Sequence, residues 1–352
     1  MGAVSIEADE RLVHPEFSAS AAEYFRIWIV NLLFTLLTFG LYSSWAKVRK
    51  RRYFYGSTRL DGDSFDYFAS PKTILKGRIV AAAIFVAYAL VGELHPQSQY
   101  VFWGVGILVL PWLVVRALAF NSRNSGYRGL RFDFQGTTKE AARVYIGMLV
   151  VVVLTAGLAF PWFMARQKSF VASRHALGTS RFECALPVRA VYGIYLRAAL
   201  LMLAFAVPGV ALTSFVAYKQ FDGELRVPEW MSWATFLLPV IPIYAGYAVA
   251  FAYSQARSAN LLWGNVRAPG VRFACALSAR KLTRIYFGNI LAVACSAGLL
   301  IPWAVVRTLR YRLENFSMIV KGDPLYERNP ALAQVGASSQ ELGEFFNLDL
   351  GV

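Results

Sequence analysis

Charged side chains are scarce in this chain of 352 residues. Asp, Glu, Lys and Arg make up only 16% of the sequence, whereas hydrophobic residues make up 57%. Soluble proteins do not need long uncharged runs, but a bilayer-spanning helix needs about 20 such residues. Seven long runs are present, at 27–46, 79–92, 94–115, 144–165, 198–218, 230–256 and 285–306. Because helices satisfy their own backbone in lipid, we expect an all-α polytopic membrane protein with about seven hydrophobic helices.

Residues arranged for catalysis or metal binding are also lacking. The sequence contains no His-Glu-x-x-His, no phosphate-binding Gly-x-x-x-x-Gly-Lys-Ser/Thr and no Gly-x-Ser-x-Gly. The three cysteines lack the spacing of a disulfide framework or a metal site. Cys184 and Cys275 lie in two copies of Arg-Phe-x-Cys-Ala-Leu, for which shared ancestry is favoured over a redox pair. We therefore expect no enzyme activity, no metal and no cofactor.

One acidic cluster leaves two interpretations open. Asp61, Asp63 and Asp66 lie close together around Gly62. Carboxylates at this spacing are able to hold a cation. An ordinary Gly-Asp turn is the favoured alternative, because Asp and Gly are typical turn residues.

The charge that is present is mostly positive. The sequence has 36 Lys and Arg residues against 21 Asp and Glu, which gives a net charge of +15. Such an excess suits nucleic acid, but the basic residues cluster at the ends of the apolar runs, as in 47–52. This pattern is typical of the positive-inside rule. We therefore expect no nucleic acid, and we expect the partner to be the lipid bilayer with its anionic headgroups.

A short skeleton occurs three times in the chain. Starting at Gly40, Gly157 and Gly298, Trp follows Gly by five residues, Arg follows Trp by four and an aromatic residue follows Arg by four. A partial fourth copy lies at 111–116. The resulting pairs are Trp45/Arg49, Trp112/Arg116, Trp162/Arg166 and Trp303/Arg307. A spacing of four places the two side chains on one helix face. They are either interfacial anchors or the lining of one vestibule that binds anionic headgroups or solutes.

The similarity extends beyond this skeleton and divides the chain into units. A polar leader, 1–26, lacks the basic start and apolar core of a secretory signal. Short strand-like segments in the basic loops predict a small cytoplasmic β-layer, and the segment 342–348 is expected to pack against it. The predicted units are A (17–131, helices 1–3), B (132–271, helices 4–6), C (272–316, helix 7) and a soluble tail (317–352), and the strand-like segments are 60–68, 131–134, 178–185 and 272–275.

The first part of the chain resembles a known family. The runs 31–33, 37–43, 45–49 and 52–56, which include Thr38-Phe39-Gly40-Leu41-Tyr42 and Trp45-Ala46-Lys47-Val48-Arg49, look like the YjgN-like family of bacterial inner-membrane proteins. The resemblance covers nearly the whole chain and is most specific in its first 70 residues. It implies a multi-pass protein of the bacterial inner membrane. It supplies no catalytic residues.

Polar residues inside the apolar runs bear on function. Asn31, Arg197 and Asn289 lie within or at the start of such runs, and a water-accessible cavity lined by them favours transport. Our leading interpretation is a non-enzymatic protein that moves or accommodates a small solute or a lipid. The alternative is a membrane scaffold that binds partners or anionic lipid through its basic cytoplasmic face.

The distribution of basic residues leaves two topologies open. Seven crossings with the leader outside place 22 Lys and Arg inside and 13 outside, apart from Arg197. If 144–165 and 285–306 each enter and leave on the same side, the split becomes 31 and 4. The second split fits the positive-inside rule better. However, each run is long enough to cross once, so seven crossings are favoured.

Overall fold

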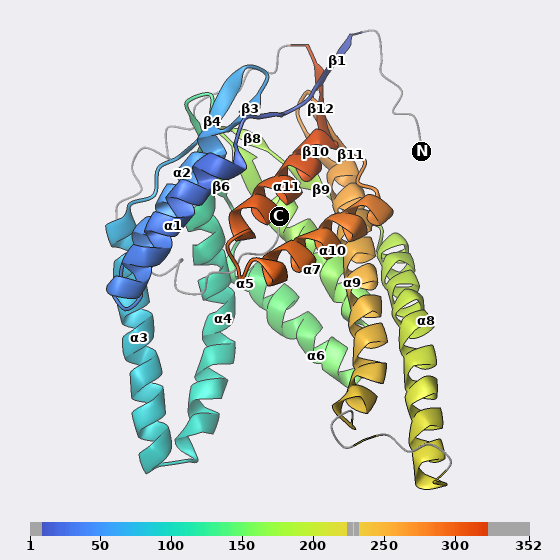
Figure 1. Ribbon diagram of the computed structural model, residues 1–352. Coiled ribbons are helices and arrows are strands. Elements are labelled where there is room, and N and C mark those ends of the chain that lie inside the picture. Colours follow the sequence, from blue (N-terminus) through green and yellow to red (C-terminus); the bar gives the residue numbers. More distant parts are fainter. Residues whose placement is uncertain (1–8, 224–227, 229–231, 323–352) are drawn as a thin grey trace.

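All strands of the described chain lie at one end, and helices project from them (Figure 1). The computed structural model describes residues 9–223, 228 and 232–322. The strands are β1 (Glu10–Val13), β2 (Glu16–Phe17), β3 (Thr58–Leu60), β4 (Asp63–Tyr67), β5 (Ser125–Tyr127), β6 (Leu130–Phe134), β7 (His175–Leu177), β8 (Ser180–Arg181), β9 (Glu183–Cys184), β10 (Val266–Ala268), β11 (Val271–Cys275) and β12 (Phe316–Lys321). The helices are α1 (Ala21–Leu37), α2 (Ser43–Gly56), α3 (Pro71–Leu94), α4 (Ser98–Arg123), α5 (Thr138–Ala142), the π-helix η1 (Arg143–Gly147), α6 (Met148–Leu154), α7 (Phe160–Ser173), α8 (Val188–Phe221), α9 (Ser232–Asn265), α10 (Ala279–Cys295) and α11 (Ile301–Glu314).

The strands form two antiparallel sheets. One has the order β1-β12-β11-β10-β9 and the other the order β2-β3-β4-β5-β6-β7-β8. The chain passes directly from β1 to β2 and from β8 to β9, so the sheets are joined at both ends. Buried side chains from both sheets, including Leu60, Leu177 and Val320, pack in one cluster between them. This shared core explains how strands of only two to six residues are stable.

Every helical excursion returns the chain to a strand next to the one it left. The excursion α1–α2 joins β2 to β3, and α3–α4 joins β4 to β5; these strands are paired neighbours. In the same way, α5–α7 lies between β6 and β7, α8–α9 between β9 and β10, and α10–α11 between β11 and β12. The five excursions are therefore helix hairpins whose ends all lie on one side.

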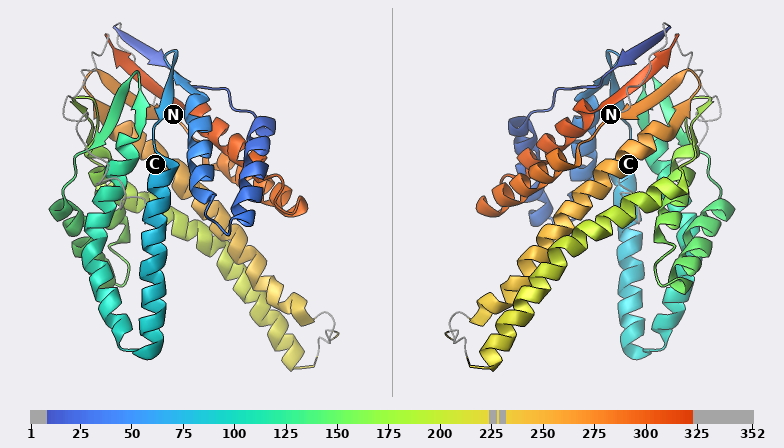
Figure 2. Two further views of the ribbon diagram at one scale, coloured as in Figure 1. Left: turned by 90° about the vertical axis from the view of Figure 1, so that its left-hand side faces the viewer. Right: turned by 90° about the vertical axis from the view of Figure 1, so that its right-hand side faces the viewer.

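Two of the hairpins are long. Among the described residues, α3, α4 and α8 are long and apolar enough to cross a membrane. The helix α9 has the same 34-residue length as α8 and lies along it in both views of Figure 2. Because β10 pairs with β9, α9 returns the chain to the strand from which α8 set out. The predicted runs 79–92 and 198–218 are helical throughout, 94–115 is helical from Ser98 onward, and 230–256 is helical from Ser232, where its description begins.

The other three hydrophobic runs differ from the prediction. Each of 27–46, 144–165 and 285–306 is broken into two helices by a tight turn. The turns contain Phe39–Gly40, Ala156–Gly157 and Ala297–Gly298, all with positive φ between 47° and 92°. A Thr or Ser one residue earlier is the C-cap of the first helix and accepts a hydrogen bond from the backbone N–H of the residue just before the second helix, as in Ala159 N to Thr155 Oγ1 at 3.1 Å. The left-handed turn ends the first helix and this hydrogen bond holds the turn closed, so the seven-helix prediction is wrong for these runs.

The predicted β-layer is present and larger than expected. Strands form at or within all four predicted segments, and β1, β2, β5, β7, β10 and β12 were not predicted. The strands β1 and β2 lie in the predicted polar leader, and β12 begins at the predicted boundary with the tail. The segment 342–348, which we expected to pack against the layer, lies outside the described residues.

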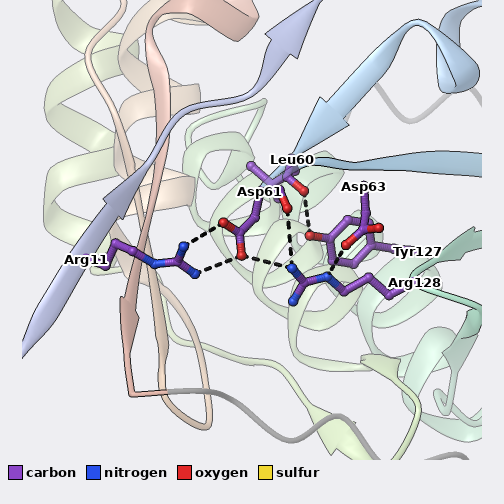
Figure 3. A network of polar contacts seen from close by, with 6 residues as sticks. All are labelled: Arg11, Leu60, Asp61, Asp63, Tyr127 and Arg128. Atoms are coloured by element: carbon purple, nitrogen blue, oxygen red, sulfur yellow. Dashed lines mark hydrogen bonds and ion pairs between the residues drawn. The ribbon is translucent and has the colours of Figure 1, made fainter.

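An ion-pair network links β1 to two strand turns (Figure 3). The Arg11 guanidinium donates to both carboxylate oxygens of Asp61 at 2.8 Å, and Arg128 binds Asp61 and Asp63 at 2.9 and 2.6 Å. The hydrogen bonds and charge of Arg11 and Arg128 lower the pKa of Asp61. The hydroxyl of Tyr127 donates to the Leu60 carbonyl oxygen at 2.7 Å. Two carboxylates of the predicted acidic cluster are therefore engaged by arginines in a turn.

Candidate functional site

An open groove lies between α10, α11 and the start of α1. Its volume is about 490 Å³. Figure 2 shows α10 and α11 beside α1, and the Arg310 guanidinium holds these elements together through a 2.9 Å hydrogen bond to the Ala19 carbonyl oxygen. Four cations line it: Lys281, Arg284, Arg307 and Arg310. The remaining lining is Ala21, Ile285, Trp303, Val306, Tyr311 and Glu314.

The four cations leave much of their hydrogen-bonding capacity unused. The Arg307 guanidinium lies 4.9 Å from the Trp303 ring centre and donates to Asn289 Oδ1 at 3.3 Å. The Lys281 ammonium lies 4.9 Å from the ring centre of Tyr311. Within the part of the chain that the structure describes, none of the four makes an ion pair, although Glu314 also lines the groove. The groove is therefore a positively charged cavity able to attract an anion.

The groove changes character along its length. Lys281 is in the first turn of α10, and Arg310 and Glu314 are in the last two turns of α11, all close to the strands. Ile285, Trp303 and Val306 lie further along the hairpin, toward the turn that joins its two helices. Lys281 and Arg310 thus lie near the strands and Trp303 lies nearest the turn, while Arg284 and Arg307 lie between them, beside Ile285 and Val306.

The predicted Trp–Arg pairs occupy equivalent positions but do not share a vestibule. Trp45, Trp162 and Trp303 are each the third residue of the second helix in a short hairpin, and each is half-buried. Among the described residues, the guanidinium contacts the indole in two of the four pairs, Arg116/Trp112 at 5.7 Å and Arg307/Trp303 at 4.9 Å. Only Trp303 and Arg307 line the groove, and Trp45/Arg49, Trp112/Arg116 and Trp162/Arg166 line neither of the two described cavities.

The predicted intramembrane polar residues are also dispersed. Asn31 is 7% exposed, and its Oδ1 has no partner among the described residues. The Asn289 amide instead donates to Thr308 Oγ1 at 2.9 Å and to the Ala304 carbonyl at 3.2 Å, so it ties α10 to α11. Arg197 is exposed on α8. Neither described cavity is lined by any of the three.

The sequence analysis did not single out Lys281, Arg284, Arg310 or Tyr311. It counted these residues as basic loop charges or as part of the repeated skeleton. The signal was their spacing: Lys281 and Arg284 are three apart, and so are Arg307 and Arg310, which places each pair on one helix face. A two-helix interpretation of 285–306 was needed to see that the two faces meet.

The described residues contain no group of three or more His, Cys, Asp and Glu that is arranged to hold a metal ion. Cys184 and Cys275 are both free thiols and both half-buried. Burial raises the pKa of the Cys184 thiol to about 11 and also raises that of Cys275. These thiols are thus kept protonated at neutral pH, which is typical of packing residues.

These features define a mostly helical multi-pass membrane protein with a layer of strands on one side. Residues 14–345 match the family described as bacterial protein of unknown function (DUF898), and the chain belongs to that family. It is similar to the curated proteins called Inner membrane protein YjgN, so the YjgN-like resemblance is confirmed. With helices apolar enough to span a bilayer, these relatives place the protein in the bacterial inner membrane.

The similarity to these relatives is partial. The chain is 29% identical over 126 residues to the YjgN protein of Salmonella typhimurium strain LT2, a match that covers 36% of this chain and 32% of the relative. It is 23% identical over 181 residues to that of Escherichia coli O157:H7, covering 51% of this chain and 43% of the relative. For Escherichia coli K12 the identity is 25% over 150 residues, covering 41% and 36%. The matched part thus spans less than half of each relative. No solved structure matches the chain.

Proposed function

We propose that the protein accommodates the anionic headgroup of a membrane lipid in the groove between α10, α11 and α1. One observation carries this proposal: four cations without ion pairs in the described chain line a cavity of about 490 Å³. Charge-assisted hydrogen bonds to a phosphate are stronger than neutral ones, typically about 1.5–3 kcal/mol each. A zwitterionic headgroup carries the same phosphate together with an ammonium group that the four cations repel, so the groove should favour an anionic headgroup.

The polarity along the groove supports a lipid over a free anion. A headgroup phosphate fits the end that holds Lys281 and Arg310, near the strands. The glycerol backbone and first acyl carbons fit the end that holds Ile285, Trp303 and Val306. Tryptophan is favoured at this level of a bilayer, where one side of its ring is apolar and the other polar. A free phosphate ion has no apolar part that could contact the side chains of this end.

The role that we propose is non-enzymatic, with no nucleic-acid partner. Transport of a small solute has weaker support, because Asn31, Arg197 and Asn289 line neither described cavity. We also propose that the three short hairpins descend from an internal repeat, with units at 17–131, 132–271 and 272–316. The equivalent positions of their Trp and positive-φ residues support this.

Lipid titration of the full-length protein, followed by native mass spectrometry, tests the proposal. The test variant is Lys281→Gln/Arg284→Gln, because both side chains are exposed and make no ion pair among the described residues. The matched control is Lys139→Gln/Arg143→Gln, which removes the same charge from exposed positions on another short hairpin. We expect phosphatidylglycerol to be retained in preference to phosphatidylcholine, and we expect the test variant alone to lose about tenfold or more in affinity.

Two outcomes contradict the proposal. Equal losses in both double variants mean that general surface charge attracts the lipid. Equal retention of phosphatidylglycerol and phosphatidylcholine by the unaltered protein means that the groove does not select an anionic headgroup. A third arm adds glycerol phosphate as a competitor: displacement of the lipid at matched concentrations identifies a site for free anions.

A further inference from the structure

The three short hairpins present apolar tips that have no protein partner in the described chain. Large hydrophobic side chains there are strongly exposed: Phe39 by 99%, Leu154 by 79% and Leu158 by 77%, and Leu299 by 52%. Exposed apolar surface of this extent indicates a contact with lipid or protein. The uncharged composition of all three tips points to an apolar medium.

Arginines bracket each tip at equivalent positions. On the first helix of each hairpin, eleven uncharged residues follow Arg26, Arg143 or Arg284 before the helix ends. On the second helix, six residues precede Arg49, Arg166 or Arg307, and all of them are uncharged apart from Lys47. Arginine stays at the level of the lipid phosphates where it can. The six arginines therefore mark where each hairpin enters and leaves the hydrocarbon.

The length of helix between each arginine and the tip sets the depth to which a hairpin inserts. At about 1.5 Å per helical residue, the first leg reaches about 16 Å beyond its arginine and the second leg about 9 Å. The hydrocarbon core of a bilayer is about 30 Å thick, so one leaflet contributes about 15 Å. A tip on such legs, even when they stand along the bilayer normal, ends at or short of the midplane. By contrast, the long helix α8 has 34 residues and reaches the far side.

The strand layer fixes which leaflet is entered. Both ends of each short hairpin join neighbouring, paired strands, so both helices start from the same side. Backbone in hydrocarbon must have its polar groups satisfied within the protein. Here the turns satisfy theirs locally, as in Gly40 N to the Thr35 carbonyl oxygen at 2.7 Å and Tyr42 N to Thr38 Oγ1 at 2.9 Å.

We infer that the three short helix hairpins form an interaction surface for the acyl chains of one leaflet only, the leaflet on the side of the strands. In that leaflet the protein has the legs of all five hairpins, whereas α3, α4, α8 and α9 are the helices of the described chain that continue into the opposite leaflet. The cross-section of the protein is therefore larger on the strand side. This inference does not depend on lipid-headgroup binding in the groove.

Single-cysteine fluorescence tests it in reconstituted vesicles. Cys295 is exposed and lies next to the third tip, so a protein with Cys184→Ser and Cys275→Ser reports on that tip at a native residue. Phe39→Cys and Leu158→Cys in a background without native cysteines report on the other tips. The matched control is Gln97→Cys, in the exposed turn between α3 and α4. Each cysteine carries a small fluorophore such as bimane.

We expect lipids brominated near the ends of their acyl chains to quench the three tip probes strongly, and aqueous iodide on either side to quench them weakly. Iodide on the side opposite the strands should quench the probe at position 97. Iodide quenching of the tips from that opposite side would overturn the inference, because the hairpins would then cross the bilayer. Iodide quenching from the strand side would also overturn it, because the tips would then lie in water. Cys295 keeps the test valid if the substituted tips fold poorly.

Discussion

The Tyr311 hydroxyl makes two hydrogen bonds to the backbone of one residue, Ser278. It accepts from the Ser278 N–H at 2.9 Å and donates to the Ser278 carbonyl oxygen at 3.3 Å. In the first hairpin, the Tyr53 hydroxyl accepts from the Ser20 N–H at 3.0 Å and donates to the Ser20 carbonyl oxygen at 3.2 Å. In both cases the serine caps the first helix of a hairpin and the tyrosine lies on the second. This contact fixes the angle at which a short hairpin leaves the strands.

Tyr311→Phe should destabilise the protein, because Tyr311 is only 3% exposed and the Ser278 backbone groups lose their partner. Leaving buried polar groups unsatisfied costs about 1–3 kcal/mol. The measurement is the thermal unfolding midpoint of the purified protein in detergent. The control is Tyr244→Phe on α9, where the side chain is 70% exposed. Equal midpoints for the two variants would show that the contact contributes no stability.

Gly157→Ala should destabilise the second short hairpin through its backbone alone. The glycine has φ +89°, and an added Cβ would meet nothing within 4 Å, so strain is the only cost. Placing an L-residue in such a conformation costs about 1–3 kcal/mol. Gly147→Ala is the matched control, because this glycine is helical and equally uncrowded. A thermal midpoint lower for Gly157→Ala than for Gly147→Ala is expected; the reverse order would mean that no left-handed turn forms there.

These hairpins show where the sequence was informative and where it was not. The runs around Thr38, Thr155 and Ser296 have the length and composition of a spanning helix, and length was the criterion that favoured seven crossings. What breaks them is a short local sequence of three residues. The first is a Thr or Ser whose hydroxyl accepts a hydrogen bond from a backbone N–H across the turn, and the next two, of which the second is Gly, adopt positive φ. This short sequence leaves the mean hydropathy of the run unchanged, so a criterion based on length and hydropathy does not detect it. The distribution of Lys and Arg between the two sides of the membrane did favour re-entry for two of the three runs.

The groove was harder to predict than the fold. Trp303 and Arg307 belong to the repeated skeleton, but Lys281 and Arg284 become their neighbours only because Ala297–Gly298 folds α11 back on α10. The strands were easier, because Gly-rich turns and alternating residues mark them locally. Their joining into a layer with a common core depends on partners as distant as β1 and β12, whose pairing no local pattern reveals.

Asp61→Asn should reduce stability in a pH-dependent way. Hydrogen bonds and charge from Arg11 and then Arg128 lower the pKa of Asp61 below its ordinary value in the folded state. The ion pairs therefore add stability above the unfolded pKa of about 3.9, and this stability is lost as pH falls through the folded pKa. Because Arg11 is largely exposed, we expect only about 0.5–1 kcal/mol at neutral pH.

The measurement for this carboxylate is the unfolding midpoint of both proteins between pH 7 and pH 3. The difference between unaltered protein and Asp61→Asn should be greatest at neutral pH and should shrink in acid. The control is Asp66→Asn, an exposed carboxylate three positions beyond Asp63. A difference that stays constant over this range would show that the charge of Asp61 is not what stabilises the turn.

Gly246→Ala should loosen the packing of α9 on α8, and it is the sharpest test of the long hairpin. A Cβ at Gly246 would lie 2.7 Å from the Phe205 Cβ and 3.2 Å from the Met202 carbonyl oxygen, both on α8. Helices pack this closely in membranes only where a small residue lets the backbones approach, so the methyl group forces them apart at about 1–3 kcal/mol. The control is Gly193→Ala on α8, where the added Cβ would meet nothing within 4 Å. We expect the unfolding midpoint in detergent to fall for Gly246→Ala and to stay or rise for Gly193→Ala, because alanine is the better helix former. Equal midpoints would mean that α8 and α9 do not pack against each other through this face.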